Sequence, residues 1–219
     1  MIAGRIEAVC VVHALRETGR RRVPTTGIDK RPVTGPVHIG ELGLTGDRQC
    51  DTANHGGRFK AVYAYGECEA RRWETDLGRE LPAGWFGENL RVSGLSPTDA
   101  VIGERWRIGD SGAILEVTGP RTPCRTFVNW AGAPDWAARF SARADTGAYL
   151  RVVAEGPVRA TDTIVVEDVP EHGATVRDVH TGSNPERIVA MLARQADLAP
   201  SVADKARRQV TGRKTEEQR

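Results

Sequence analysis

Glycine and proline constrain this chain most strongly. The 219 residues include 24 glycines and 12 prolines, which divide the sequence into short segments. Six of these segments are rich in β-branched or aromatic residues and are bounded by turn formers, which is typical of strands. They are Arg5–Val12, Ala61–Tyr65, Glu104–Ile108, Ala113–Thr118, Ala148–Val153 and Thr161–Glu167. Because strands and helices do not alternate regularly, the sequence predicts a mainly β (α+β) body, an antiparallel or mixed barrel or sandwich.

Two helices are expected to pack on this body. Apolar residues recur at helical spacing in Glu67–Leu77, and Gly78 is placed to end that helix in a left-handed conformation. In Ala133–Ala144 the apolar residues again share one face, and Pro134 suits the first turn.

The character of the chain changes after about Pro170. Asn184-Pro185 is typical of a helix start, and Ile188, Val189 and Leu192 then form an apolar stripe. A further segment, Ser201–Val210, is helical and basic. We therefore expect a β domain over residues 1–170, and a small helical appendage with a polar tail over residues 171–219.

Composition limits the partners. With 27% charged and 39% hydrophobic residues the chain has ordinary globular composition, and a net charge of +2 requires no polyanionic partner. Lys205, Arg207 and Arg208 are expected to form a solvated helix face, because acidic residues surround them and no base-reading motif is present. No run approaches the roughly 18 to 20 apolar residues that cross a bilayer, and no secretory signal is evident, so we expect a cytoplasmic protein with no membrane or nucleic-acid partner.

The four cysteines show neither zinc-type spacing nor a redox CxxC, so we expect thiols with individual roles. Cys10 and Cys68 fall within a strand and a helix and are expected to pack, whereas Cys50 has no evident place. Cys124 ends the run Pro120–Cys124, which two prolines stiffen, and arginines on both sides of the thiol favour its thiolate form. Spacing alone leaves a buried, inert cysteine equally open.

Two further clusters could carry chemistry. In Gly46–Gly57, the side chains of Asp47, Asp51 and His55 could bind a metal or move protons, although a tight turn explains them equally well. In Trp85–Leu90, Glu88 and Asn89 beside a glycine suit hydrogen bonding to a heterocycle, and they suit a structural bulge equally.

Taken together, these motifs and their order resemble a known family. From about residue 38 to 167 the chain is similar to MOSC domains, specifically to their YiiM-like bacterial branch. The matching segments are Gly46–Gly57, Ala61–Tyr65, Trp73, Phe86–Leu90, Ile108–Asp110, Pro120–Cys124 and Gly147–Val152. The tail after Pro170 is loosely similar to the three-helix appendage of that branch, and Arg16–Pro36 has no recognisable counterpart.

The resemblance implies a MOSC-type β-barrel that holds a molybdenum cofactor of the molybdopterin type. Cys124 matches the family's metal ligand, and a thiolate suits thiophilic molybdenum. The resemblance also assigns His55 and Asp47 to positioning ligands or delivering protons. The cofactor-binding candidates are Arg121, Lys60, Asn89, Glu88 and Arg151. Pyridoxal phosphate binding is implied only as a description of the family.

The activity that the resemblance implies is reduction of N-hydroxylated compounds, namely N-hydroxylated bases, amidoximes and hydroxylamines. This chemistry consumes two electrons and two protons. The sequence has no motif for a flavin, an iron–sulfur cluster or a nicotinamide, so a separate electron-donor protein is expected. Two alternatives stay open: binding or carrying the cofactor without turnover, and sulfur transfer through a persulfide on Cys124. A homodimer is also left open.

Overall fold

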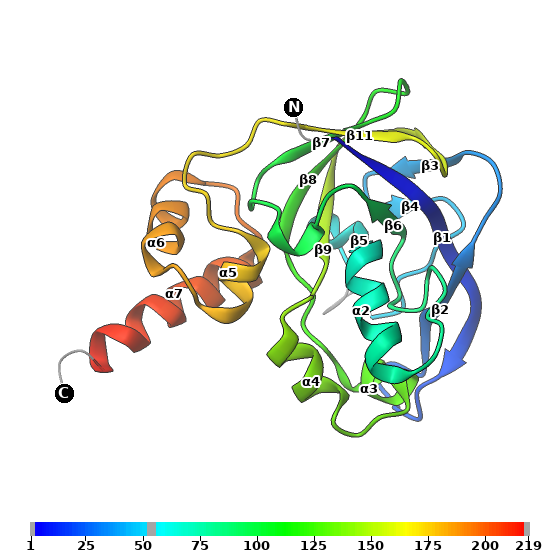
Figure 1. Cartoon of the computed structure of the whole chain (residues 1–219), viewed down its shortest axis with the longest axis horizontal. Helices are drawn as coiled ribbons and strands as arrows, with labels where there is room; N and C mark the ends of the chain where they lie inside the picture. Colours follow the sequence, from blue (N-terminus) through cyan, green and yellow to red (C-terminus); the bar gives the residue numbers. More distant parts are fainter. Residues whose placement is uncertain (1–2, 52–55, 217–219) are drawn as a thin grey trace.

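Seven strands close into a β-barrel, and an eighth extends it as a hairpin (Figure 1). The computed structural model describes residues 3–51 and 56–216, with side chains to residue 212. The sheet runs in the order β11-β7-β8-β9-β5-β6-β1-β2, and β11 also pairs with β1, which closes the ring. The predicted mainly β body is therefore a barrel with helices around it. The barrel strands and β2 are β1 (Ala3–Glu17), β2 (Thr25–Pro32), β5 (Val62–Gly66), β6 (Leu90–Ser93), β7 (Arg105–Ile108), β8 (Ala113–Pro120), β9 (Ala148–Ala154) and β11 (Thr163–Glu167).

A small second sheet, β10-β3-β4, lies beside the barrel. Its strands are β3 (Val37–Gly40), β4 (Gly43–Leu44) and β10 (Gly156–Val158). Two short 3-10 helices, η1 (Arg58–Lys60) and η2 (Pro97–Asp99), connect larger elements.

One strand pair, β5 with β6, is parallel, and the predicted helix α2 (Glu67–Leu77) makes the crossover between them. Glu69 reaches back to accept a hydrogen bond of 3.0 Å from the Gly66 N–H, which satisfies one of the unpaired donors at the helix start. The helix ends at Gly78, whose φ of 61° is left-handed. The sequence-based prediction for this helix is confirmed.

An aromatic core separates the barrel wall from its packing helices. Trp136 of α4 (Trp136–Arg143) is fully buried, with its ring centre 4.5 Å from that of Trp73 and 5.3 Å from that of Phe127. Phe127 belongs to α3 (Arg125–Ala131), which starts directly after Cys124. This packing anchors the loop that carries Cys124 against a rigid wall.

Three helices follow the last barrel strand and lie to the left of the barrel in Figure 1. They are α5 (Val176–Thr181), α6 (Pro185–Arg194) and α7 (Pro200–Glu216). Val179, Met191 and Val202 join the same apolar cluster as the barrel interior. The predicted helical character after residue 170 is therefore present, while the division of the chain into two domains there stays a prediction.

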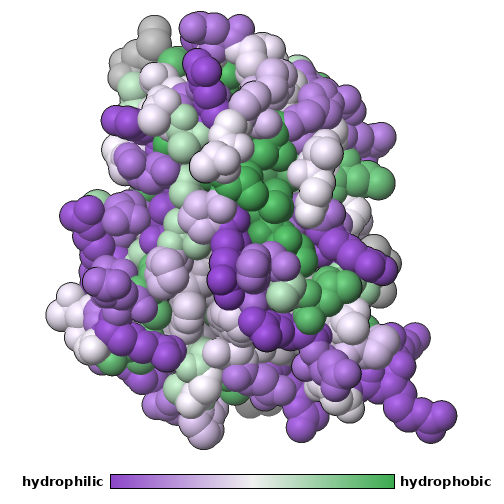
Figure 2. Space-filling model, turned by 90° about the vertical axis from the view of Figure 1, so that its right-hand side faces the viewer, coloured by the Kyte–Doolittle hydropathy of each residue, from purple (hydrophilic) through white to green (hydrophobic). Residues whose placement is uncertain are grey.

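The face formed by β1 to β4 carries an apolar band between polar borders (Figure 2). On these strands and in the turns between them, Leu15 and Leu42 are exposed, and Val11, Val33 and Val37 are half-buried. Within residues 3–51 and 56–216, no helix combines the length and apolar character needed to span a bilayer.

Candidate functional site

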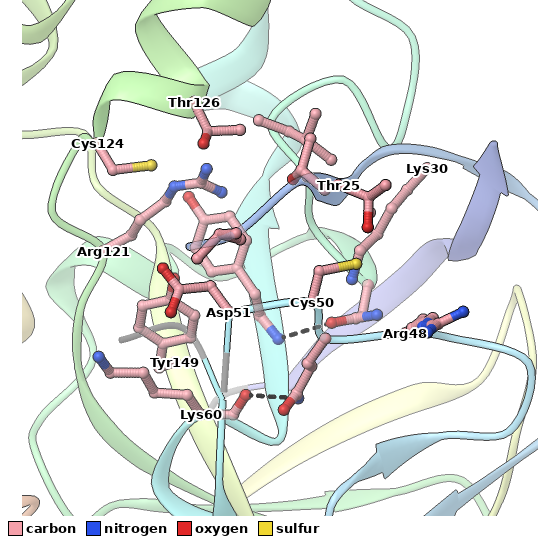
Figure 3. Close-up of a pocket in the computed structure, with 18 residues that line it drawn as sticks. Thr25, Lys30, Arg48, Cys50, Asp51, Lys60, Arg121, Cys124, Thr126 and Tyr149 are labelled. Atoms are coloured by element: carbon pink, nitrogen blue, oxygen red, sulfur yellow. Dashed lines mark hydrogen bonds between the residues drawn. The ribbon is translucent and has the colours of Figure 1, made fainter. Parts of the chain in front are cut away.

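Cys124 lies in a cavity whose walls come from segments far apart in the sequence (Figure 3). The start of β2 forms one side, the segment 48–51 another, and β5, β9 and the loop before α3 complete it. The polar and aromatic side chains that line it are Thr25, Thr26, Lys30, Arg48, Gln49, Cys50, Asp51, Lys60, Tyr63, Asn89, Arg121, Cys124, Thr126 and Tyr149. The structure thus brings the Cys124 loop together with the segment 48–51 of the Gly46–Gly57 cluster.

Arg121 is the most buried cation of this cavity, with 7% of its surface exposed. Its Nη1 donates to the Phe86 carbonyl, and its guanidinium lies 4.2 Å from the Phe127 ring centre and 5.0 Å from that of Tyr63. Within the described part of the chain it forms no ion pair with a carboxylate, and its buried Nε has no hydrogen-bond partner. A guanidinium in this state is a ready partner for an anion.

The charge on Arg121 persists despite burial. Burial opposes the charged form, but the nearby Tyr149, Tyr63 and Cys124 outweigh it, so the pKa of Arg121 is raised above its ordinary value. Figure 3 shows the Cys124 thiol directed to the same side of the cavity as this guanidinium. A bound anion and a group held by sulfur would therefore be neighbours.

The loop before α3 presents the Cys124 side chain. Cys124 has extended backbone angles (φ −121°, ψ 168°) and its carbonyl accepts the first helical bond, 3.0 Å from the Val128 N–H. Its side chain is half-buried and makes no capping bond, so the thiol is directed to the cavity instead of to the helix end.

A polar network supports the floor of the cavity. Asp47 accepts three hydrogen bonds: 2.6 Å from Lys30 Nζ, 2.8 Å from Asn89 Nδ2 and 3.1 Å from the Val12 N–H. Asn89 also accepts from the Tyr63 N–H at 3.1 Å and donates to the Cys10 carbonyl at 3.3 Å. Donors thus surround the Asp47 carboxylate, and this environment suits positioning of Lys30 and Asn89 better than proton delivery.

Lys60 and Tyr149 form the opposite wall. Burial lowers the pKa of Lys60 below its ordinary value, with a smaller opposing effect from Asp51. Burial raises the pKa of the Tyr149 hydroxyl, and Arg121 partly offsets this. The Lys60 ammonium lies 5.6 Å from the Tyr149 ring centre. Lys60 therefore releases its proton more readily than an exposed lysine, whereas Tyr149 retains its own.

Two glycines let these segments come close. Gly87 has a φ of +75°, and a Cβ there would lie 3.2 Å from Arg121 Nη1. A Cβ on Gly27 would lie 2.6 Å from the Arg48 carbonyl oxygen, so only glycine lets the segment 48–51 lie against β2. Both glycines line the cavity.

Two expected cofactor contacts do not line this cavity. Glu88 is fully buried and accepts hydrogen bonds from the Gly84 N–H at 2.7 Å and from Arg91 Nη2 at 2.6 Å, which gives it a structural role. Arg151 extends away and pairs with Glu116, its cross-strand neighbour, at 2.8 Å. His55, which the resemblance assigns to positioning ligands or delivering protons, lies outside the described residues.

The other cysteines divide differently from the prediction. All four are reduced thiols, as expected, and Cys10 is fully buried in β1. Cys68 is exposed, so the prediction that it packs is wrong: its position on α2 faces away from the side that buries Ala70 and Trp73. Cys50 lines the cavity, and no sequence signal had placed it.

Comparison with known proteins assigns the family. The MOSC domain family model matches residues 51–165. YflK of Bacillus subtilis (strain 168) is 33% identical over 176 residues, which cover 78% of this chain and 79% of that protein. This chain belongs to the MOSC domain family. MOSC domains are associated with the molybdenum cofactor, while neither the family model nor these relatives support pyridoxal phosphate binding.

Other relatives agree on the family and the fold. YiiM of Escherichia coli (strain K12) is 30% identical over 62% of this chain and 61% of its own length. A Gibberella moniliformis protein named Reductase is 30% identical over 67% of this chain but only 26% of its own length. The crystal structure of YiiM from Geobacillus stearothermophilus superposes with a TM-score of 0.75 over 94% of this chain and 99% of that one, at 24% identity.

Proposed function

We propose that this MOSC domain binds a molybdopterin-type molybdenum cofactor through Cys124 and reduces N-hydroxylated compounds with electrons from a separate protein. The observation that carries the proposal is that one cavity holds both a cysteine thiol and a buried arginine that has no carboxylate partner among the described residues. A dithiolene cofactor with a phosphate offers both a metal that prefers sulfur and an anion.

The residues present fit such a group. The Nε of Arg121 is a buried donor without a partner, which is a costly arrangement unless a ligand completes it. Lys60 adds a second cation to the lining, and Cys124 supplies a soft ligand in the same cavity. Within the described residues, no group of three or more His, Cys, Asp and Glu side chains could hold a metal by itself, which agrees with a metal that brings most of its own ligands.

The cofactor would supply the two-electron redox chemistry when bound. The chain's own residues then have three tasks. Arg121 would bind and orient an anion, and Lys60 Nζ, whose pKa burial lowers, would deliver a proton to the departing oxygen. The Asp47 carboxylate would hold Lys30 and Asn89 in place under the reacting groups.

The test compares the parent protein with Cys124→Ser, both produced in a host that makes the cofactor. Serine keeps the size but offers a poor, protonated oxygen ligand, so molybdenum per chain and turnover of an N-hydroxylated base should fall by about 100-fold or more. Molybdenum is measured by elemental analysis, and turnover with an artificial electron donor.

Cys68→Ser is the matched control, because that thiol is exposed on α2 and should be neutral. Cys10→Ser should retain metal but lower the free energy of unfolding by about 1–3 kcal/mol, since it buries a hydroxyl. Full turnover in Cys124→Ser would exclude the proposal. Metal without turnover in the parent would leave a cofactor carrier, and no metal with a persulfide on Cys124 would leave sulfur transfer.

A further inference from the structure

A second cavity, which nothing above has assigned, adjoins the Cys124 cavity. The two share Thr26, Ile28 and Thr126 as common walls. The second cavity lies between the tip of the β1–β2 hairpin and the start of α3. The tip of this hairpin lies in Arg16–Pro36, for which the sequence alone shows no family counterpart.

The second cavity has an excess of unpaired positive charge. Arg16, Arg20 and Arg125 line it, whereas Glu17 is its single carboxylate. Arg16 is already neutralised by Asp29, with Nε 2.9 Å from Oδ2. Neither Arg20 nor Arg125 forms an ion pair within residues 3–51 and 56–216.

Arg20 and Arg125 are exposed, as are Arg21 and Arg22 of the same hairpin, which also form no ion pair with the described residues. The fold neutralises many of the other arginines. The arginines of β7, β9 and α5, for example, each pair with at least one carboxylate. Two guanidiniums without a carboxylate partner among the described residues line a hollow beside the proposed reaction site. They suit an anion with several acceptor oxygens, because the planar guanidinium binds phosphate through two parallel hydrogen bonds.

The rest of the wall suits an organic anion. Trp130 lines the cavity, and its Nε1 donates to the Trp85 carbonyl at 2.8 Å, which holds the ring in place. Thr126 and Asn129 add short polar side chains. A ligand with a planar group and a phosphate would therefore meet an apolar ring, hydroxyl and amide groups and two cations.

We propose that this second cavity is a phosphate subsite and that the preferred substrates are phosphate monoesters, such as N-hydroxylated nucleotides, whose N–O group reaches the Cys124 cavity. The assignment rests on the proposed reductase function. A phosphate of the cofactor is the other source of the same chemistry, but Arg121 and Lys60 already supply cations for it inside the Cys124 cavity.

The first experiment is independent of turnover. A nucleoside monophosphate is titrated calorimetrically onto the purified full chain and onto the double variant Arg20→Gln/Arg125→Gln. Loss of the two cations should weaken binding by about tenfold or more. The matched control is Arg21→Gln/Arg22→Gln, which removes the same charge from the same hairpin but from two exposed residues that line neither cavity.

The second experiment measures kcat/KM for an N-hydroxylated nucleoside monophosphate and for its free base, in molybdenum-loaded protein. The ratio of the two should fall by about tenfold in Arg20→Gln/Arg125→Gln and stay unchanged in the control. If the kcat/KM ratio falls equally in both double variants, the effect comes from the overall positive charge of the hairpin and the subsite is overturned. A fall in molybdenum content would assign the phosphate to the cofactor and overturn the substrate assignment.

The remaining outcomes separate the two proposals. If Arg20→Gln/Arg125→Gln slows turnover with a protein electron donor but not with the artificial donor, the two arginines dock the donor protein and the subsite is overturned. If the base is reduced as well as the nucleotide by every variant, the reductase stands and the subsite fails. If neither is reduced but nucleotide binding still depends on Arg20 and Arg125, the subsite stands as a binding site and the reductase function fails.

Discussion

Two cavities of this protein contain arginines, and they differ in whether carboxylates of the fold pair with these arginines. In the cavity between the barrel and the C-terminal helices, Arg151 pairs with Glu116 and Asp197, and Arg105 pairs with Glu116 at 3.2 Å. In the Cys124 cavity, Arg121 is more deeply buried and has no carboxylate partner among the described residues. The first arrangement is complete without a ligand, whereas the second is not.

A buried arginine without a carboxylate partner is therefore a better indication of a ligand site than a paired one. Paired arginines join the helices to the barrel, and their charge is satisfied by the fold itself. Arg121 has no carboxylate partner among the described residues and keeps a buried Nε donor without a hydrogen bond, so an anion that binds it would stabilise the folded chain. The two cavities therefore predict opposite responses to loss of their central arginine.

The largest effect is expected for Arg121→Met. Removing the guanidinium takes away the proposed anion contact, so molybdenum per chain should fall by about 10- to 100-fold. The free energy of unfolding of the metal-free protein should change little, because the lost Phe86 hydrogen bond and ring contacts offset the removal of a buried charge. Elemental analysis and denaturant unfolding measure the two. If Arg121→Met keeps its molybdenum, Arg121 does not bind the cofactor and the contrast between the two cavities fails.

A smaller effect of the opposite kind is expected for Arg151→Met. The change leaves the largely buried Glu116 with Arg105 alone and removes the link to Asp197, so the free energy of unfolding should fall by about 1–2 kcal/mol. Molybdenum content should not change. A loss of metal equal to that of Arg121→Met would place Arg151 at the cofactor after all.

The smallest effect concerns pH and the C-terminal helices. Burial lowers the pKa of His172, whose Nδ1 accepts from the Ala174 N–H at 3.0 Å and whose Nε2 lies 3.0 Å from Gln195 Oε1. The unfolded chain then binds a proton that the folded one does not, so stability is lost as pH falls below about 6.5 towards the lowered pKa. Hydrogen exchange of the α6 amides, expressed relative to the intrinsic exchange rate at each pH, should accelerate as the pH falls from 7 to 5.

His172→Gln is the control for this effect, because its amide can replace the neutral ring without titrating near neutral pH. Its exchange rates should lose most of the acceleration. Identical pH dependence in both proteins would show that another group controls the helices.

Much of the fold could be predicted because burial imposes it locally. The strand segments from Ala61 onwards and α2 have strong apolar patterns, and the structure confirms them within a few residues. The missed strand β2 has the sequence TTGIDKRP, whose polar and conformationally restricted residues are tolerated because it pairs with β1 alone. Helix α3 was also missed, since it lacks a side-chain cap.

The site was less predictable than the fold, because tertiary partners decide which side chains face the cavity. The sequence could mark Cys124, Arg121 and Lys60, and all three line it. It could not show that Arg151 would form an ion pair with Glu116, or that Glu88 would accept hydrogen bonds from Gly84 and Arg91. The positions of Tyr149 and Lys30 likewise depend on which segments meet, and no local pattern contains that information.

The closure of the barrel sets the timing of its assembly. Ala3 pairs with Val165, so the first strand lacks one of its neighbours until more than 160 further residues have been added. During synthesis the long strand β1 is an open edge that could pair with other chains, and contacts so distant in sequence form slowly. The walls around Cys124 include both β2 and β9 and meet only when most of the chain exists. The proposed cofactor could therefore be bound only after β11 has been made and the barrel has closed.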